Sequence, residues 1–363
     1  MKIEHIETYL VRIPFKTGAP TRILGGRTWS TLDHVFVKVE TDDGLIGWGD
    51  GFGYGAAEAT KAALDYMIAP AVIGCDARLI AGISRQLQRD NHLWGRYGVT
   101  MFAISGIDIA LWDLAGKAAN LPLAHLLGGP VRTEIPAYAS LFKYQDPETV
   151  AERVDAALQE GYGYVKLHET GVAEVAAARE VAGDEVPIMI DTNCPWTPQE
   201  AREAALSFLE FGPYWLEEPI FPPEDYDSLA RLQQDVGIPL ASGENACTAF
   251  EFQKMFNAGA VSFAQPSVTK VGGVTELLKI QTLAAMHGVA MMPHSPYFGP
   301  GFLATLQVAA AMPDAPLVER FYMDLAASPY GDAIDVHNGV FRLPEGPGLG
   351  REPDLDVIKE FSA

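Results

Sequence analysis

Three acidic residues at nearly even spacing constrain the fold of this chain more than any other feature. Asp191 precedes Glu217 by 26 positions, and Glu217 precedes Glu244 by 27. Each acid follows a short apolar run typical of a buried strand, at 186–190, 214–216 and 238–241. A repeat of this length is typical of one βα unit, so the three acids should lie at the carboxyl ends of neighbouring parallel strands.

Carboxylates gathered at one edge of a sheet repel each other unless a cation joins them. An all-oxygen ligand set suits Mg²⁺, with Mn²⁺ as a substitute, better than Zn²⁺, which prefers His and Cys. We therefore predict a magnesium site formed by Asp191, Glu217 and Glu244. A surface position without function is the simpler interpretation for any one of these acids, but the weaker one for three at matching spacing. Glu218 should support the site or lie at the surface, because adjacent strand residues face opposite sides.

The rest of the chain favours a barrel with additional structure before and after it. Eight strands are expected near 137–140, 164–168, 188–193, 214–218, 240–245, 261–267, 290–294 and 317–321. Eight such strands with helices between them indicate a parallel (β/α) barrel, whose active site lies at the strand carboxyl ends. We expect an N-terminal α+β domain over 1–130, the barrel over 131–321, and a C-terminal segment over 322–363 that packs back on the first domain.

Composition excludes several classes of partner. The net charge of −21 argues against binding nucleic acid or an anionic membrane surface, although local cations still permit an anionic substrate. Three widely spaced cysteines without a C-x-x-C motif favour free thiols in a cytoplasmic protein. Asp108 and Asp113 interrupt the apolar stretch at 102–114, so we expect no membrane span.

Other strand ends carry titratable groups that would face the same site. Residues two apart on a strand share a face, so Lys166 and His168 should both point into the barrel mouth. A divalent cation nearby would lower the pKa of Lys166 and make it a usable base; the alternative is a salt bridge to Asp191. His294 ends the seventh expected strand and would flank the substrate on the other side. Glu319 ends the eighth, where it could contact substrate or pair as a surface acid.

These residues resemble those of the enolase superfamily, specifically its mandelate racemase-like and muconate lactonizing enzyme-like members. Besides the three acids, the resemblance rests on the segment 105–113, Lys166-x-His168, Gln265-Pro266-Ser267, Val271-Gly272-Gly273, His294 and Val318-Glu319. It implies an α/β fold: a modified TIM-type (β/α) barrel with an α+β capping domain formed by the N-terminal region and the C-terminal tail. It also implies a homo-oligomer, a dimer or an octamer, and Mg²⁺ that stabilises the enediolate left when a base removes the α-proton of a carboxylate.

Two positions depart from the family pattern. The family's Lys-x-Lys strand is Lys166-x-His168 here, and Ser267 stands where the family carries Asp or Lys. Without a carboxylate partner, His294 is better suited to donating a proton than to removing one, which favours β-elimination over racemisation. Lys270 is expected on the opposite face from Ser267.

We therefore expect a Mg²⁺-dependent lyase or isomerase of carbohydrate-acid catabolism: a sugar-acid (aldonate or aldarate) dehydratase, or a cycloisomerase acting on a sugar-acid lactone. A racemase or epimerase of an α-substituted carboxylic acid, and a non-catalytic metal-binding relative, are the alternatives. Loops at 16–28 and 51–54 should cap the mouth, where Arg22 and Arg27 could bind a distal carboxylate or polyol, or remain solvated. The expected substrate-binding residues are Arg22, Arg27, Tyr54, Asn193, Gln265 and Ser267.

Overall fold

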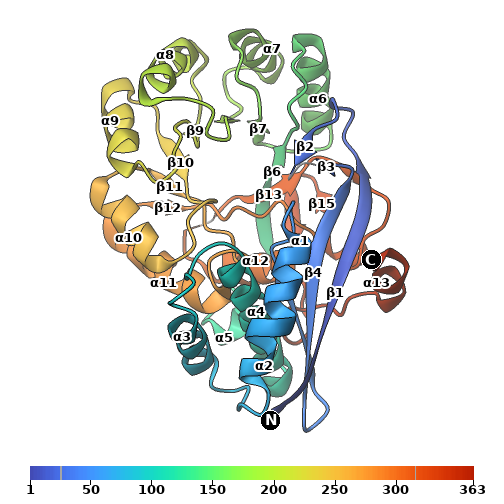
Figure 1. The fold of residues 1–363 in the computed structure, drawn as a ribbon. Helices are drawn as coiled ribbons and strands as arrows, with labels where there is room; N and C mark the ends of the chain where they lie inside the picture. The colour runs from blue at the N-terminus through green and yellow to red at the C-terminus, as the bar shows by residue number, and fades with distance from the viewer. Residues whose placement is uncertain (25–26, 315) are drawn as a thin grey trace.

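The computed structural model describes residues 1–24, 27–314 and 316–363, and all eight expected barrel strands are present in it (Figure 1). They are β6 (Glu134–Ser140), β7 (Val165–Leu167), β8 (Ile188–Asp191), β9 (Trp215–Glu217), β10 (Leu240–Ser242), β11 (Phe263–Ala264), β12 (Ala290–Met291) and β13 (Val318–Phe321). Neighbours pair in parallel from β12 through to β6, and β13 pairs with the other edge of β6. This arrangement confirms the predicted barrel strands.

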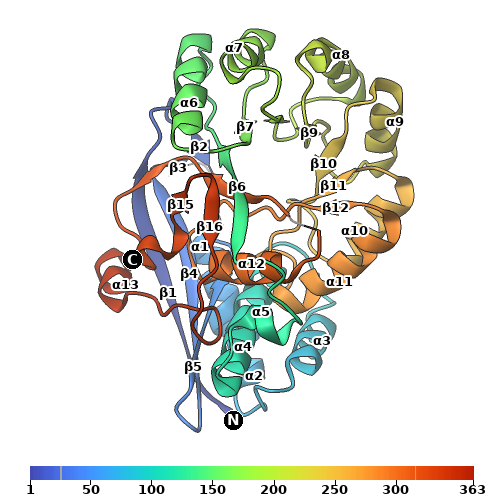
Figure 2. The same cartoon turned by 180° about the vertical axis from the view of Figure 1, so that it is seen from behind.

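Helices connect successive strands on the outside of the barrel (Figure 2). They are α6 (Pro147–Gln159), α7 (Val172–Ala182), α8 (Pro198–Phe208), α9 (Tyr226–Val236), α10 (Ala249–Ala258), α11 (Gly273–His287) and α12 (Pro300–Ala311), with a 3₁₀ turn η2 (Leu209–Phe211) after α8. Side chains fix three of the helix starts, because Asp146, Thr197 and Asp225 each accept a hydrogen bond from a backbone N–H of the first turn. Thr197 and Glu200 together form a capping box.

An antiparallel sheet and a group of helices precede the barrel. The sheet has the order β14-β1-β4-β5, with β1 (Ile3–Lys16), β4 (Thr31–Thr41), β5 (Ile46–Gly51) and β14 (Asp324–Leu325), and a hairpin of β2 (Ile23–Leu24) and β3 (Arg27–Thr28) lies between β1 and β4 in the chain. The helices are α1 (Ala57–Ala63), the π-helix η1 (Leu64–Ile68), α2 (Ala69–Val72), α3 (Ile80–Asp90), α4 (Val99–Ala119) and α5 (Leu123–Leu126). This is the predicted α+β cap.

The chain after the barrel returns to both units. Strand β14 adds to the cap sheet through β1, and the backbone N–H of Ala363 donates to the carbonyl of Leu10 at 2.9 Å. The remaining elements are η3 (Gly331–Ile334), β15 (Val336–His337), β16 (Val340–Arg342) and α13 (Leu355–Phe361), of which β16 pairs antiparallel with β6. The C-terminal segment therefore contacts the cap and also extends the barrel sheet.

Helix α4 forms the core of the cap. A Cβ on Gly49 of β5 would lie 1.9 Å from the carbonyl oxygen of Gly106, so only glycine allows strand and helix to approach this closely. By length and composition α4 could cross a membrane, despite Asp108 and Asp113, but 83% of its apolar window is buried inside the protein. It has the burial of a core helix.

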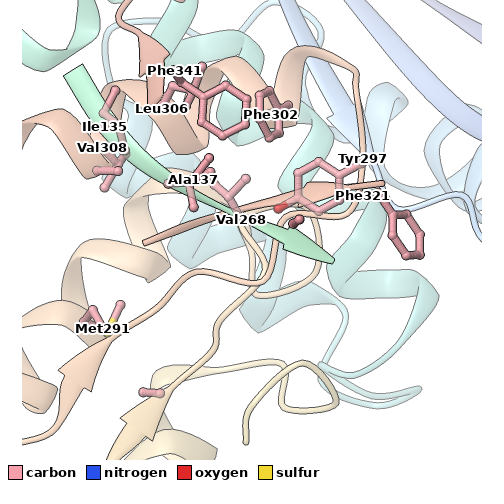
Figure 3. Close-up of a cluster of buried hydrophobic side chains, with 14 of the residues drawn as sticks. Ile135, Ala137, Val268, Met291, Tyr297, Phe302, Leu306, Val308, Phe321 and Phe341 are labelled. Carbon is pink, nitrogen blue, oxygen red and sulfur yellow. The ribbon is translucent and has the colours of Figure 1, made fainter. Parts of the chain in front are cut away.

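The inside of the barrel is apolar below the strand ends. Tyr138, Met189, Trp215, Ala241, Met292 and Leu317 form a separate buried cluster there. Because side chains alternate along a strand, Met189 and Trp215 share their faces with Asp191 and Glu217, two residues further on. On the outside of β6, Ile135 packs with Phe302 and Leu306 of α12 and with Phe341 of β16 in the main core (Figure 3). The polar strand ends therefore rest on a packed, water-excluding floor.

Candidate active site

One cavity of about 340 Å³ lies at the carboxyl ends of the barrel strands, against the cap. Its lining residues are Arg22, Ile23, Trp29, Phe52, Tyr54, Lys166, His168, Asp191, Asn193, Glu244, Lys270, His294, Pro296, Glu319 and Phe321. Five strand ends contribute to this set, and the first five residues come from the cap. The cavity therefore brings together side chains that are far apart in the sequence.

Lys166 lines the cavity, although its side chain is almost completely buried. Its Nζ lies 3.1 Å from Asp191 Oδ2, 2.9 Å from Glu217 Oε1 and 3.0 Å from Glu319 Oε1. Burial alone would lower the pKa of Lys166, but Glu217 and Glu319 outweigh it and raise the pKa well above the usual lysine value. This direction is opposite to the one expected beside a divalent cation, because here the ammonium itself balances the carboxylates.

Asp191 is held by three neighbouring groups. Its Oδ2 lies 3.1 Å from His168 Nε2 as well as contacting Lys166, and its Oδ1 accepts from the backbone N–H and side-chain amide of Asn193 at 3.0 and 2.9 Å. Burial would raise the pKa of Asp191, but Lys166 and His168 lower it overall. The His168 Nδ1 donates to the carbonyl of Leu141 at 2.5 Å, which directs Nε2 toward Asp191.

Glu217 is the register partner of Asp191 on the adjacent strand. Its Oε2 accepts from the indole N–H of Trp215 at 2.8 Å, while burial and the charge of Asp191 raise the pKa of Glu217 well above the usual value. Glu218 points elsewhere, as expected, and accepts from the Ser242 hydroxyl at 2.7 Å and the Gly243 N–H at 3.0 Å. Glu218 therefore supports the loop that carries Glu244 and does not line the cavity.

His294 and Glu244 form a pair on the other side of the cavity. His294 Nε2 lies 2.8 Å from Glu244 Oε2, and His294 Nδ1 lies 2.5 Å from the hydroxyl of Ser267. Burial would raise the pKa of Glu244, but its interaction with the neighbouring His294 ring lowers it to about 2. Ser267 also lies 3.2 Å from the backbone oxygen of His294, so this hydroxyl fixes the orientation of the ring.

The three predicted ligands fit a hard cation by their chemistry. All are carboxylates, and two of them, Asp191 and Glu217, meet at Lys166, whose positive charge balances theirs. Glu244 contacts His294 instead. Among the described residues, no group of three or more His, Cys, Asp or Glu side chains is arranged so that it could hold a metal ion. All three donors are therefore carboxylate oxygens, the type of ligand that Mg²⁺ prefers. In this structure each acid is paired with a cationic side chain.

The structure separates the predicted substrate-binding residues into two groups. Arg22, Tyr54 and Asn193 line the cavity, and the Tyr54 hydroxyl is buried without a hydrogen-bond partner among the described residues. Ser267 contacts His294 and does not line the cavity. Gln265 does not line the cavity either, and its buried amide makes no hydrogen bond within the described part of the chain. The side chain of Arg27 lies outside the described residues.

Sequence reasoning missed an aromatic group. Trp29, Phe52 and Phe321 line the cavity. Lys270, which was expected on the opposite face from Ser267, also lines the cavity, with Nζ 4.8 Å from the centre of the Phe52 ring, whereas Ser267 does not. Aromatic residues in loops follow no periodic pattern, so the sequence did not indicate that they would line the cavity.

Comparison with known families decides the classification. Residues 5–128 match the mandelate racemase / muconate lactonizing enzyme N-terminal domain, and residues 149–357 match the enolase C-terminal domain-like family. The chain belongs to the enolase superfamily. More narrowly, it is a mandelate racemase and muconate lactonizing enzyme-like member, as the motifs indicated.

Individual relatives extend over the whole chain. A D-galactarolactone cycloisomerase of Agrobacterium fabrum is 33% identical over 384 residues, which cover 99% of both proteins. A crystal structure of the 3,6-anhydro-D-galactonate cycloisomerase from Zobellia galactanivorans is 31% identical, with a TM-score of 0.89 and full coverage of both chains. A crystal structure of L-talarate dehydratase from Polaromonas sp. JS666, complexed with Mg and L-glucarate, is 29% identical, with a TM-score of 0.87, and covers 100% of this chain and 97% of that one.

Proposed function

We propose that this enolase superfamily member is a Mg²⁺-dependent enzyme that removes the α-proton of a sugar-acid carboxylate and then eliminates the β-substituent. It is a sugar-acid dehydratase or a cycloisomerase acting on a cyclic sugar acid, and thus a lyase or isomerase. The observation that carries the proposal is the cavity, in which Lys166 and His294 stand among carboxylates from consecutive strand ends. The similar dehydratase and cycloisomerases support it.

Each polar residue has a role in this reaction. Mg²⁺ held by Asp191, Glu217 and Glu244 would supply the positive charge that stabilises the dianion and would compete with the Lys166 ammonium for these carboxylates. Lys166, in its neutral form, takes the α-proton, and its contact with Glu319 keeps Nζ at the cavity wall. The apolar floor beneath the site keeps water from competing for that proton.

Elimination is favoured over racemisation by the surroundings of His294. A two-base racemase needs a second residue that removes protons readily. The Nδ1 of His294 faces a serine hydroxyl and no carboxylate, while Nε2 lies against Glu244, which also lines the cavity. His294 is therefore placed to donate a proton to the leaving group or to the intermediate.

Several finer expectations stay predictions. They are the substitution of Mn²⁺ for Mg²⁺, a dimeric or octameric assembly, a cytoplasmic location without nucleic-acid or membrane partners, the domain boundaries at 130 and 321, and the substrate-binding roles of individual residues. A sugar-acid substrate is the coarser statement that the relatives support. None of the finer expectations is needed for the reaction proposed.

The proposal is tested with a panel of aldonates, aldarates and their lactones, each incubated with enzyme and Mg²⁺. Formation of a 2-keto acid from at least one compound, detected by NMR and abolished by EDTA, is the expected result. Interconversion of stereoisomers without a 2-keto product would favour the racemase alternative and overturn the elimination step.

A further inference from the structure

The cavity has two chemically different walls. Lys166, His168, Asp191, Glu244 and His294 form the polar wall at the barrel strand ends. Trp29, Tyr54 and Phe321 line the same cavity, and we call these three rings the aromatic wall. Trp29 and Tyr54 belong to the cap, whereas Phe321 ends β13. A molecule in this cavity therefore meets the charged groups of the barrel strand ends together with aromatic rings, and Arg22 adds one charge from the cap.

Trp29 is the centre of the aromatic wall. Its ring centroid lies 5.8 Å from that of Tyr54 and 5.9 Å from that of Phe321. From behind, Phe15 packs edge-on at 5.1 Å and Phe142 lies at 5.7 Å. Contacts on several sides hold the indole in one orientation, so its position does not depend on a ligand.

The two walls meet at Phe321. This ring stacks on Phe142 with centroids 4.6 Å apart, and its centroid lies 6.3 Å from that of the His168 imidazole. His168 in turn contacts Asp191, so only the side chain of His168 separates Phe321 from this predicted metal ligand. A substrate whose carboxylate lies at the polar wall must therefore extend its carbon skeleton along the rings.

Tyr54 is the member of the aromatic wall that carries a hydroxyl. Its hydroxyl is buried without a hydrogen-bond partner among the described residues. A buried hydroxyl without a partner is costly, but this oxygen is covered by protein and does not face the cavity surface. The wall therefore presents ring surface, and little polar surface, to a ligand.

We propose that the aromatic wall selects sugar acids that contain a ring, such as a lactone or an anhydro sugar, over open-chain acids, which makes this enzyme a cycloisomerase. The inference rests on the function proposed above and narrows its substrate class. A ring presents a compact face of C–H groups that packs on aromatic surfaces, whereas an open-chain polyol exposes hydroxyls along its length and would leave them unsatisfied there.

The reaction of a ring substrate follows the same chemistry. Lys166 takes the α-proton, the electrons of the C–H bond form a double bond to the β-carbon, and the bond from the β-carbon to the ring oxygen breaks. The ring oxygen leaves as a carboxylate from a lactone, or as a hydroxyl after protonation from an anhydro sugar. The enol that results becomes a 2-keto acid. No water is lost, and no oxidant or further reactant is needed.

The test compares kcat/KM for D-galactarolactone, a ring compound, with that for D-galactonate, an open-chain acid. The wild-type enzyme should prefer the ring compound. Trp29→Leu should reduce that preference by roughly ten-fold, the value of one good aromatic contact, mainly through KM. Trp29→Phe should retain most of it. Trp94→Leu is the matched control, because Trp94 is exposed and lies outside the cavity lining.

The preference for the ring compound over the open-chain acid can also be measured as binding, without turnover, by saturation-transfer NMR of both compounds with each variant. Stronger transfer to the ring protons in the wild type, lost in Trp29→Leu but not in Trp94→Leu, supports the inference. A wild-type preference for D-galactonate, or a preference unchanged by Trp29→Leu, overturns it. Elimination from open-chain acids alone would still support the proposed function, so the two failures are distinguishable.

Discussion

At the residue scale, the active site depends on how each charge is paired. Lys166 contacts three carboxylates, while His294 contacts one carboxylate and one hydroxyl. The sequence predicted which of these residues would meet, because each ends a strand and the alternation of side chains gives its direction. It could not predict their pairing, since the contact between Glu244 and His294 crosses from one strand end to another two strands away.

Ser267 provides the hydroxyl that contacts Nδ1 of His294, so replacing Ser267 should change the ratio of elimination to racemisation. In Ser267→Asp, a carboxylate at Nδ1 would stabilise the protonated ring and make neutral His294 a stronger proton acceptor. We expect increased exchange or racemisation at the α-carbon relative to elimination, measured by NMR in D₂O. If elimination and racemisation keep their wild-type ratio in Ser267→Asp, the argument from Ser267 fails. Ser207→Asp, on α8 and outside the cavity lining, is the control.

At the element scale, the sequence predicted the barrel strands but not the short strands β14, β15 and β16 of the C-terminal segment. Most barrel strands were located by an apolar run that ends in polar residues, because burial on both faces demands such a run. Strands β14, β15 and β16 have two or three residues each, so their sequences carry no periodicity, and only tertiary contacts place them. Of the aromatic wall, only Tyr54 was expected to bind substrate; Trp29 lies in the loop between β3 and β4, where no periodicity indicates the direction of its side chain.

Helices α4 and α11 meet at a buried carboxyl that should make stability depend on pH. Asp108 accepts a hydrogen bond from the Thr275 N–H at 2.9 Å, but burial raises the pKa of Asp108 to about 7. The folded protein therefore keeps this proton between about pH 4 and 7, where the unfolded chain has lost it. The free energy of unfolding should fall as pH rises through this window, by up to roughly 4 kcal/mol, and stay lower above it.

Asp108→Asn removes this titration and should flatten that part of the profile. Urea unfolding at pH 5 and pH 8 measures the effect for both proteins. We expect the variant to gain stability relative to wild type between pH 5 and pH 8, because only the wild type has to bury a charge at the higher pH. A difference between the two proteins that is the same at both pH values would show that Asp108 titrates normally.

At the scale of the whole molecule, the site joins parts of the chain that fold as separate layers. The cap contributes Arg22, Trp29 and Tyr54, the barrel contributes the charged groups, and β14 after the barrel adds a strand to the cap sheet. Asp191, Glu217 and Glu244 carry three carboxylates at the strand ends, so a cation bound by them should stabilise the folded protein. The sequence predicted this organisation through its motifs, although the loop geometry that shapes the cavity depends on packing between the layers.

Magnesium should therefore raise the melting temperature. Binding to the folded state alone stabilises a protein by about 2.7 kcal/mol at a concentration one hundred times Kd. Asp191→Asn should lose most of this increase, because Asp191 would donate an oxygen to the ion. Asp184→Asn, in the loop before β8, is the matched control and should keep it. An equal magnesium effect in Asp191→Asn and the wild type would place the ion elsewhere.

The most direct test of the account is hydrogen exchange at the α-carbon of a sugar-acid substrate in D₂O with Mg²⁺, compared between wild type and Lys166→Ala. Exposed Lys254→Ala serves as the control, and circular dichroism verifies that each variant is folded. We predict deuterium incorporation or 2-keto product in the wild type and in Lys254→Ala, and a loss of at least roughly a hundred-fold in Lys166→Ala. Exchange at the full rate in folded Lys166→Ala would contradict the assignment of Lys166 as the base.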